Sequence, residues 1–268
     1  MEVNPGRPMP GQGIGRSSVF SLLTSCRSFL YPQGMNTQRP DIHKLDIPCE
    51  VDPETAFRSI RVPGNNESRR EAARELAFSS VAVAKPLGVY MEAPARVIDR
   101  GKVEIGGTVF KSRALSKNLE GLETVYPFLV TIGRELDEYP LEPGRMMLRF
   151  FLDTIKTLVL VTAVNYLAER IHFKYGLTGV AHMNPGEIPD WPITEQKPLF
   201  SLFHGAEKEI GVELRPGGIM KPVKSRSGVI FENDCEFATC FLCTQEGCPG
   251  RRYKYDVDKV REYLGAPA

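Results

Sequence analysis

A long, largely apolar helical segment, from Arg145 to about Phe173, restricts the fold of this chain more than any other feature. Its stretch from Phe150 to Leu167 is apolar enough to raise the question of a membrane span. Asp153, Lys156 and Asn165 interrupt that stretch, so it never reaches the roughly eighteen uninterrupted apolar residues of a membrane helix. We therefore expect a helix that is buried in the core of a globular domain.

The composition agrees with a globular domain. The chain has 268 residues, of which 42% are hydrophobic and 25% are charged, and a chain of this length buries a substantial core. Its formal net charge of +1 lacks the basic excess of nucleic-acid-binding proteins, so we expect no nucleic-acid partner. The apolar run Val19–Leu23 is shorter than the apolar region of a signal peptide, so we expect a cytoplasmic protein that does not bind membranes.

Local patterns in the first half predict helices and hairpins. Residues 1–40 are rich in Gly, Pro, Ser and Arg without any periodicity, and we expect them to be disordered. Glu67–Phe78 has its Ala, Leu and charged residues at helical spacing. Apolar and polar residues alternate from Ala93 to Ser112 around glycine-containing turns, which is typical of hairpins.

The second half continues the mixture. We predict a strand followed by a helix in Asn118–Glu138, and a helix in Thr194–Glu209. We predict two short strands in Val212–Phe231, separated by Gly217-Gly218. Helices and hairpins in mixed order, without regular alternation, indicate an α+β fold.

Four cysteines near the C-terminus form the pattern C-x4-C-x2-C-x4-C: Cys235, Cys240, Cys243 and Cys248. Clustered cysteines outside a secreted context are typical of metal ligands rather than of disulfides. Thiolates are soft donors that select zinc, copper(I) or iron–sulfur clusters. Cys26 and Cys49 stand apart from this group, and we expect neither to be a ligand.

The spacing favours an iron–sulfur cluster, most simply a 4Fe-4S cluster, over zinc. The first three cysteines share the C-x4-C-x2-C spacing of plant-type ferredoxins. Structural zinc sites usually pair two C-x2-C turns, whereas here only Cys240 and Cys243 form one. Phe237, Phe241 and Leu242 would shield a cluster from water. Zinc, redox-active thiols and buried thiols without a metal remain the alternatives.

The segment from His182 to Pro192 is the other unusual stretch, since it holds three prolines and the only tryptophan of the chain. Prolines fix backbone φ angles, and stiff irregular loops are frequent ligand sites. In the alternative interpretation, Trp191 fills the core and the prolines only turn the chain. The candidate ligand-binding residues of this loop are His182, Asn184, Pro185, Gly186, Glu187, Asp190 and Trp191.

Several segments in the same order resemble the activation domain of cobalamin-dependent methionine synthase and its stand-alone relatives. Together they cover roughly residues 50–231. They are Thr131–Asp137 (TIGRELD), Leu152–Ile155 (LDTI), Asn184–Phe200 with its Asn-Pro-Gly and Asp-Trp-Pro, Ile210–Leu214 (IGVEL), and Met220–Gly228 (MKPVKSRSG).

The resemblance implies an α+β domain, residues 41–232, with an antiparallel sheet and long helices. It implies a groove that binds S-adenosylmethionine, to which Ser225 and Ser227 would also contribute. The family's domain docks on a corrinoid-carrying module, where an electron and a methyl group restore methylcobalamin. Where the family has an arginine and a tyrosine in its loop, this chain has His182 and Glu187. A histidine cannot reproduce the bidentate grip of arginine on a carboxylate.

These observations lead to one main hypothesis and two alternatives. The main hypothesis is an accessory or reductive-activation protein for a corrinoid methyltransferase such as methionine synthase. In it, the cysteine-rich tail, residues 233–268, relays an electron from a donor protein to cobalamin on the partner. The first alternative is a zinc- or cluster-stabilised docking module without electron transfer. A free-standing methyltransferase is less supported, because no glycine-rich loop follows a strand and opens a helix.

Overall fold

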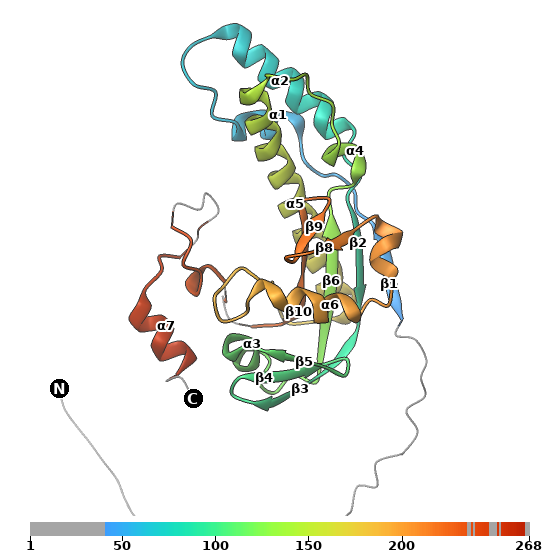
Figure 1. The fold of residues 1–268 in the computed structure, drawn as a ribbon, viewed down its shortest axis with the longest axis vertical. Coiled ribbons are helices and arrows are strands. Elements are labelled where there is room, and N and C mark those ends of the chain that lie inside the picture. Colours follow the sequence, from blue (N-terminus) through green and yellow to red (C-terminus); the bar gives the residue numbers. More distant parts are fainter. Residues whose placement is uncertain (1–40, 235–236, 238, 247–250, 252, 266–268) are drawn as a thin grey trace, which may run out of the picture. The chain divides into compact units, whose positions relative to one another are not determined.

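The longest helix, α5 (Met146–Tyr175), forms where the sequence predicts it and lies against an antiparallel sheet (Figure 1). This computed structural model describes residues 41–234, 237, 239–246, 251 and 253–265. The expected disorder of residues 1–40 therefore lies outside the described residues. None of the described helices combines the length and the hydropathy of a membrane-spanning segment. Gly176 ends α5 in the left-handed conformation (φ 62°), which glycine adopts without strain.

Eight strands form the main sheet, and every pairing in it is antiparallel. The central strand β6 pairs with β2, β3 and β10, and β10 carries the edge strand β7. The strands are β1 (Ile42–Asp46), β2 (Leu87–Met91), β3 (Ala93–Asp99), β4 (Lys102–Ile105), β5 (Thr108–Lys111), β6 (Thr124–Thr131), β7 (Val180–Met183) and β10 (Ser225–Glu232). The expected α+β architecture is present.

The two faces of the sheet support two apolar cores. One core lies on the α5 side, where α1 (Pro53–Ser59) and α2 (Glu67–Ala82) pack together and against α5 (Figure 1). The other core contains side chains of α3 (Arg113–Asn118) and α6 (Gln196–Ser201). Strand β6 alternates between them: Phe128 belongs to the α5 side and Leu129 to the opposite side, as the two-residue period of a strand requires.

Two regions differ from the sequence predictions. The helix expected over Thr194–Glu209 is broken into η1 (Ile193–Glu195), α6 and η2 (Ala206–Ile210). The break has a local cause, because Gly205 has φ 99° and a helix cannot continue through that conformation. The region 212–231 holds three strands rather than two, namely the small hairpin β8 (Glu213–Arg215) and β9 (Ile219–Lys221) followed by β10. A short helix, α4 (Arg134–Asp137), follows β6 as predicted.

The described part of the cysteine-rich segment packs on the core opposite α5. Leu242 is 2% exposed and belongs to that core. The Phe237 ring stacks on Tyr263 and meets the Phe231 ring at a tilt. Tyr263 lies in the C-terminal helix α7 (Val257–Leu264), which contacts α3. Lys117 of α3 donates a hydrogen bond of 2.7 Å to the Tyr263 carbonyl oxygen. The segment therefore shares a core with the sheet.

Candidate functional site

The loop after β7 is held by its own backbone hydrogen bonds. The Gly186 amide donates to the Trp191 carbonyl oxygen (2.8 Å), and the Trp191 amide donates to the Ile188 carbonyl oxygen (3.2 Å). Gly186 has φ 89°, a conformation that L-residues with side chains rarely adopt. The loop is consequently a defined turn whose first residues stay close to β10.

Four polar side chains gather on the α5-facing side of β7 and β10. Asn184 Nδ2 lies 3.2 Å from His182 Nδ1, and Arg226 Nη2 lies 3.6 Å from Glu187 Oε1. Gly228 lies on the same face, and a side chain there would collide with the Asn184 carboxamide, the Met183 carbonyl and the Phe128 ring. The missing side chain at Gly228 is therefore what lets the loop approach the sheet. We call His182, Asn184, Glu187 and Arg226 the polar cluster.

The chemistry of the polar cluster suits a polar ligand that carries both charges. Glu187 and Arg226 keep 30% and 31% of their side chains exposed, so both charges are accessible to solvent. Asn184 is 4% exposed, and its Oδ1 has no hydrogen-bond partner among the described residues. A buried acceptor without a partner costs about 1–3 kcal/mol, and proteins normally satisfy such atoms with water or a ligand.

Asp190 has a structural role. Its carboxylate accepts hydrogen bonds from the Ala114 amide (2.8 Å), the Ser112 hydroxyl (2.9 Å) and Arg113 Nε (3.0 Å). These donors surround the first turn of α3, where backbone amides lack helical partners. The three hydrogen bonds described for the Asp190 carboxylate thus all come from residues at the start of α3, and not from the polar cluster.

Trp191 and Pro185 are buried. Trp191 is completely buried in the core opposite α5, where its ring meets Phe110 edge-on at 6.3 Å between centroids. Its Nε1 has no partner among the described residues. The structure therefore agrees with the interpretation in which Trp191 fills the core.

The two candidate serines of β10 lie on the sheet face opposite to the polar cluster. Ser227 is paired in register with Leu129 and is 2% exposed, so its side chain enters the core away from α5. Ser225 donates a 2.8 Å hydrogen bond to the Pro222 carbonyl oxygen and so closes the preceding turn. Neither serine reaches the side of the sheet on which His182 and Arg226 lie.

Of the four candidate metal ligands, Cys240 and Cys243 are described, while Cys235 and Cys248 lie outside the described residues. Cys240 and Cys243 share one turn, in which the Cys243 amide lies 3.4 Å from the Cys240 carbonyl oxygen. The Arg251 guanidinium donates hydrogen bonds to the Cys240 carbonyl oxygen (3.4 Å) and to the Cys243 carbonyl oxygen (3.0 Å). In the described part of the chain, no three His, Cys, Asp or Glu side chains are grouped closely enough to hold a metal ion. Cys240 and Cys243 are separated by two residues, the C-x2-C spacing that many metal sites use.

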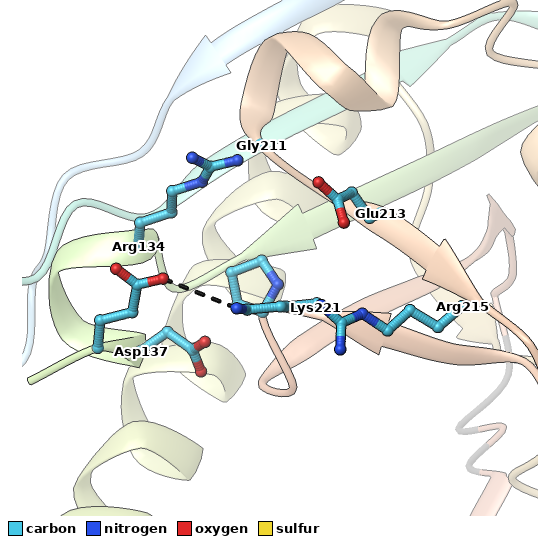
Figure 2. Close-up of a pocket in the computed structure, with 8 residues that line it drawn as sticks. Arg134, Asp137, Gly211, Glu213, Arg215 and Lys221 are labelled. Atoms are coloured by element: carbon cyan, nitrogen blue, oxygen red, sulfur yellow. Dashed lines mark ion pairs between the residues drawn. The ribbon is translucent and has the colours of Figure 1, made fainter.

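A separate concavity has a volume of about 230 Å³, and none of the predicted site residues lines it. Figure 2 shows the residues that do. Its charged residues are balanced, with three cations and three carboxylates, and Lys221 pairs with Glu138 at 3.8 Å. It brings together three of the sequence segments that carry the family resemblance. The lining residues are Arg134, Asp137, Glu138, Gly211, Glu213, Arg215, Lys221 and Pro222.

Burial lowers the pKa of a lysine beside this concavity. Lys156 of α5 donates a 2.6 Å hydrogen bond to the Asp137 carbonyl oxygen, and desolvation lowers its pKa more than the charges of Asp137 and Asp153 raise it. Lys156 is one of the residues that interrupt the apolar stretch of α5. Its ammonium group therefore anchors α4 to the long helix.

Sequence reasoning missed Arg226 as a site residue. Its charge stands at the half-buried start of a strand whose next five residues are buried, and its partner Glu187 lies far away in sequence. Most residues of Figure 2 belong to the resembling segments, whereas Glu138 and Arg215 lie next to them in sequence. Their convergence depends on the fold of β8 and β9 beside α4, which the sequence does not reveal.

The chain is similar in fold to a solved structure. No family model matches the chain, and no curated protein matches it either. Among solved structures, the chain is similar to the one described as the crystal structure of the MetH reactivation domain bound to AdoHcy. The TM-score is 0.54 at 17% sequence identity, and the match covers 75% of this chain and 81% of that one. The mixed antiparallel sheet and helices described above thus resemble the fold of that domain.

Proposed function

We propose that this protein is an accessory or reductive-activation protein for a corrinoid-dependent methyltransferase such as methionine synthase. The observation that carries the proposal is the similarity of its fold to the MetH reactivation domain, whose structure was determined with AdoHcy bound. The sequence segments that resemble this family add support, because three of them meet in one concavity.

We propose that the polar cluster binds the amino-acid end of S-adenosylmethionine or of AdoHcy. An α-amino acid presents a carboxylate and an ammonium group, and Arg226 and Glu187 offer one opposite charge to each. The Asn184 Oδ1 acceptor would meet a donor of the ligand. The task of these residues is to hold the methyl donor in one orientation, which is how a positioning site accelerates a transfer.

We propose that Cys235, Cys240, Cys243 and Cys248 hold an iron–sulfur cluster. The shared turn of Cys240 and Cys243 supports this, because two thiolates that leave one turn can bind the same centre. When bound, such a cluster would supply single electrons for reduction of the partner's cobalt. Arg251 keeps the backbone of this turn in place, since it binds the carbonyl oxygens of both cysteines.

Calorimetric titration of the full chain with AdoHcy tests the donor site. We expect binding in the wild-type protein and at least a tenfold loss of affinity in Arg226→Met, because a buried or half-buried charged hydrogen bond contributes about 1.5–3 kcal/mol. Arg96→Met is the matched control, since Arg96 also forms an ion pair on a strand but lies away from the cluster. Equal affinities in all three proteins would exclude this site.

Anaerobic purification followed by iron, sulfide and zinc analysis tests the metal site. The relay is tested by the rate of cob(II)alamin reduction in a corrinoid protein, with and without this chain. A fully metallated protein that neither binds a corrinoid protein nor affects cobalt reduction would refute the proposal.

The C-x2-C turn also favours a second candidate function, a zinc-stabilised docking module for a corrinoid protein. Such turns are common in structural zinc sites, and Leu242 in this turn is packed into the core. Zinc at one equivalent, without visible absorption, together with binding of a corrinoid protein, would support this candidate over the electron relay.

A further inference from the structure

The concavity of Figure 2 lies between two walls that are fixed to each other and to the core. One wall is α4, which carries Arg134 and Asp137 and is tied to α5 by the 2.6 Å hydrogen bond from Lys156 to the Asp137 carbonyl oxygen. The other wall is the hairpin of β8 and β9. The Ile132 amide donates a 3.3 Å hydrogen bond to the Lys224 carbonyl oxygen. This bond joins the chain just before α4 to the chain just after β9.

The alternation of side chains along β8 turns two charges into the concavity. Val212 and Leu214 pack in the core opposite α5, whereas Glu213 and Arg215 line the concavity. Successive side chains of a strand point to opposite faces, so burial of the two apolar residues fixes the direction of the two charged ones. Packing of the core therefore holds one carboxylate and one guanidinium at this wall.

Gly211, just before β8, gives the guanidinium of Arg134 its place. A Cβ at Gly211 would lie 3.2 Å from Arg134 Nε, and Gly211 has φ 69°, a conformation that favours glycine. A side chain at this position would compete with the guanidinium for the same space. Arg134 thus packs from α4 against bare backbone of the facing wall.

Four charged side chains of the concavity form no ion pair with another described residue. They are Arg134, Asp137, Glu213 and Arg215, whereas Lys221 and Glu138 pair with each other at 3.8 Å. In Figure 2 the charged ends of these four side chains turn towards one space from different sides. Opposite charges that surround a cavity without pairing are available to a ligand that carries both signs.

The balance of charges restricts the class of ligand. A simple anion would meet the carboxylates of Asp137 and Glu213, and a simple cation would meet the guanidiniums of the two arginines. In the part of the chain that the structure describes, these carboxylates are not grouped closely enough to hold a metal ion. The volume of about 230 Å³ is below the about 300–1,000 Å³ of pockets for drug-sized ligands, so a ligand here must be small.

We infer that this concavity binds a small α-amino acid in its zwitterionic form. Its carboxylate lies between Arg134 and Arg215, since a guanidinium matches a carboxylate with two parallel hydrogen bonds, and its ammonium group lies between Asp137 and Glu213. No residue of the polar cluster lines the concavity, so this site is separate from the proposed donor site. Its test requires neither S-adenosylmethionine nor a corrinoid nor a metal.

Nuclear magnetic resonance titration of the isotope-labelled full chain with L-alanine provides the test. We expect the amide signals of Arg134, Gly211 and Glu213 to shift and to saturate. Two matched probes carry one charge each, because propionate lacks the ammonium group of alanine and ethylammonium lacks its carboxylate. Each should bind about tenfold more weakly than L-alanine, the factor that one charged hydrogen bond contributes.

Single substitutions should change the preference among these probes. Arg134→Met should weaken L-alanine binding about tenfold. Glu213→Gln should weaken L-alanine binding but strengthen propionate binding, because it removes a carboxylate that repels the anion. A general loss of structure would not exchange one preference for the other. Arg61→Met is the matched control, since Arg61 is an exposed arginine that does not line the concavity, and it should behave like wild type.

The outcomes distinguish this site from the proposed donor site. Arg226→Met should lose AdoHcy binding and keep the L-alanine shifts at the concavity, whereas Arg134→Met should do the reverse. Three results would overturn the inference and leave the proposed function untouched: no shift of the three amide signals, equal affinities for propionate and L-alanine, or unchanged L-alanine affinity in Arg134→Met.

Discussion

Asp190 Oδ1 lies 3.0 Å from Arg113 Nε, and this pair joins the loop after β7 to the first turn of α3. Both side chains are mostly buried, with 12% of Asp190 and 32% of Arg113 exposed. The same carboxylate also accepts hydrogen bonds from the Ser112 hydroxyl and the Ala114 amide. The Asp-Trp-Pro segment therefore anchors the end of the loop in two ways. Asp190 binds it to α3, and Trp191 packs it into the core.

Asp190→Ala should destabilise the protein by about 3 kcal/mol, because it leaves a half-buried guanidinium and two further donors without their acceptor. Urea unfolding at neutral pH measures the change. Glu142→Ala is the control: Glu142 forms an exposed ion pair with Arg145 at 3.4 Å, and its loss should cost less than about 0.5 kcal/mol. Comparable losses in the two variants would contradict the anchoring role.

Gly228→Ala should destabilise the protein by about 3 kcal/mol and abolish any ligand binding at the polar cluster. The added methyl group would collide with backbone at Met183 and with the Asn184 carboxamide, so the loop must move away from β10. Gly88→Ala is a matched control in β2 of the same sheet, where the nearest atom is the flexible end of Ile47 at 3.2 Å. Thermal unfolding and AdoHcy calorimetry on both variants provide the comparison, and a stable, ligand-binding Gly228→Ala protein would disprove the close approach.

Leu242→Ala should cost about 3 kcal/mol, since a fully buried leucine loses its transfer free energy and leaves a cavity. Val257→Ala on α7, where the side chain is 45% exposed, should cost less than about 1 kcal/mol. Chemical denaturation of the full chain measures both.

A chain that ends at Glu232 should still unfold cooperatively, because the core on the α5 side contains no residue of the cysteine-rich segment. Its midpoint should nevertheless fall, since the opposite core loses Leu242 and the contacts of Tyr263. A broad, non-cooperative transition would show that the cysteine-rich segment is indispensable to the fold.

Stability should fall as the pH rises from 10 towards 12, and Tyr126 should account for part of the loss. Burial, together with the negative charge of Glu92, raises the pKa of Tyr126 from 10.0 to about 12. In that range the unfolded tyrosine has lost its proton while the folded one retains it, so unfolding is favoured. Tyr126→Phe cannot ionise and should lose about 2 kcal/mol less than wild type between pH 9 and pH 11.5, measured by urea unfolding. Equal losses would contradict this assignment.

The sequence predicted the regular elements well where a single periodic pattern decides the structure. The helix expected over Arg145–Phe173 is α5, Met146–Tyr175, and the alternation from Ala93 to Ser112 is the three strands β3, β4 and β5. The helix expected over Thr194–Glu209 was wrong in its continuity, because Gly205 adopts a left-handed conformation that periodicity does not reveal.

The structure brings together only some of the residues that were predicted to form the candidate site. The loop from His182 to Trp191 is a defined turn, and His182, Asn184 and Glu187 do lie close together. Asp190, Trp191, Ser225 and Ser227 are turned towards α3, the core or the opposite face of the sheet. Successive side chains of a strand point to opposite faces of the sheet. The face that each β10 side chain occupies therefore depends on the pairing register of β10, which a single sequence does not reveal.

The sequence by itself determined the α+β class, the long core helix and the C-x2-C turn, because these depend on local spacing and periodicity. Only the tertiary structure decided that Arg226 meets Glu187, that three resembling segments meet in one concavity, and that Thr239 holds the His182 carbonyl. Each of these contacts joins residues that are distant in the chain. Their distances follow from strand order and register, which arise from the packing of the two cores rather than from any local preference.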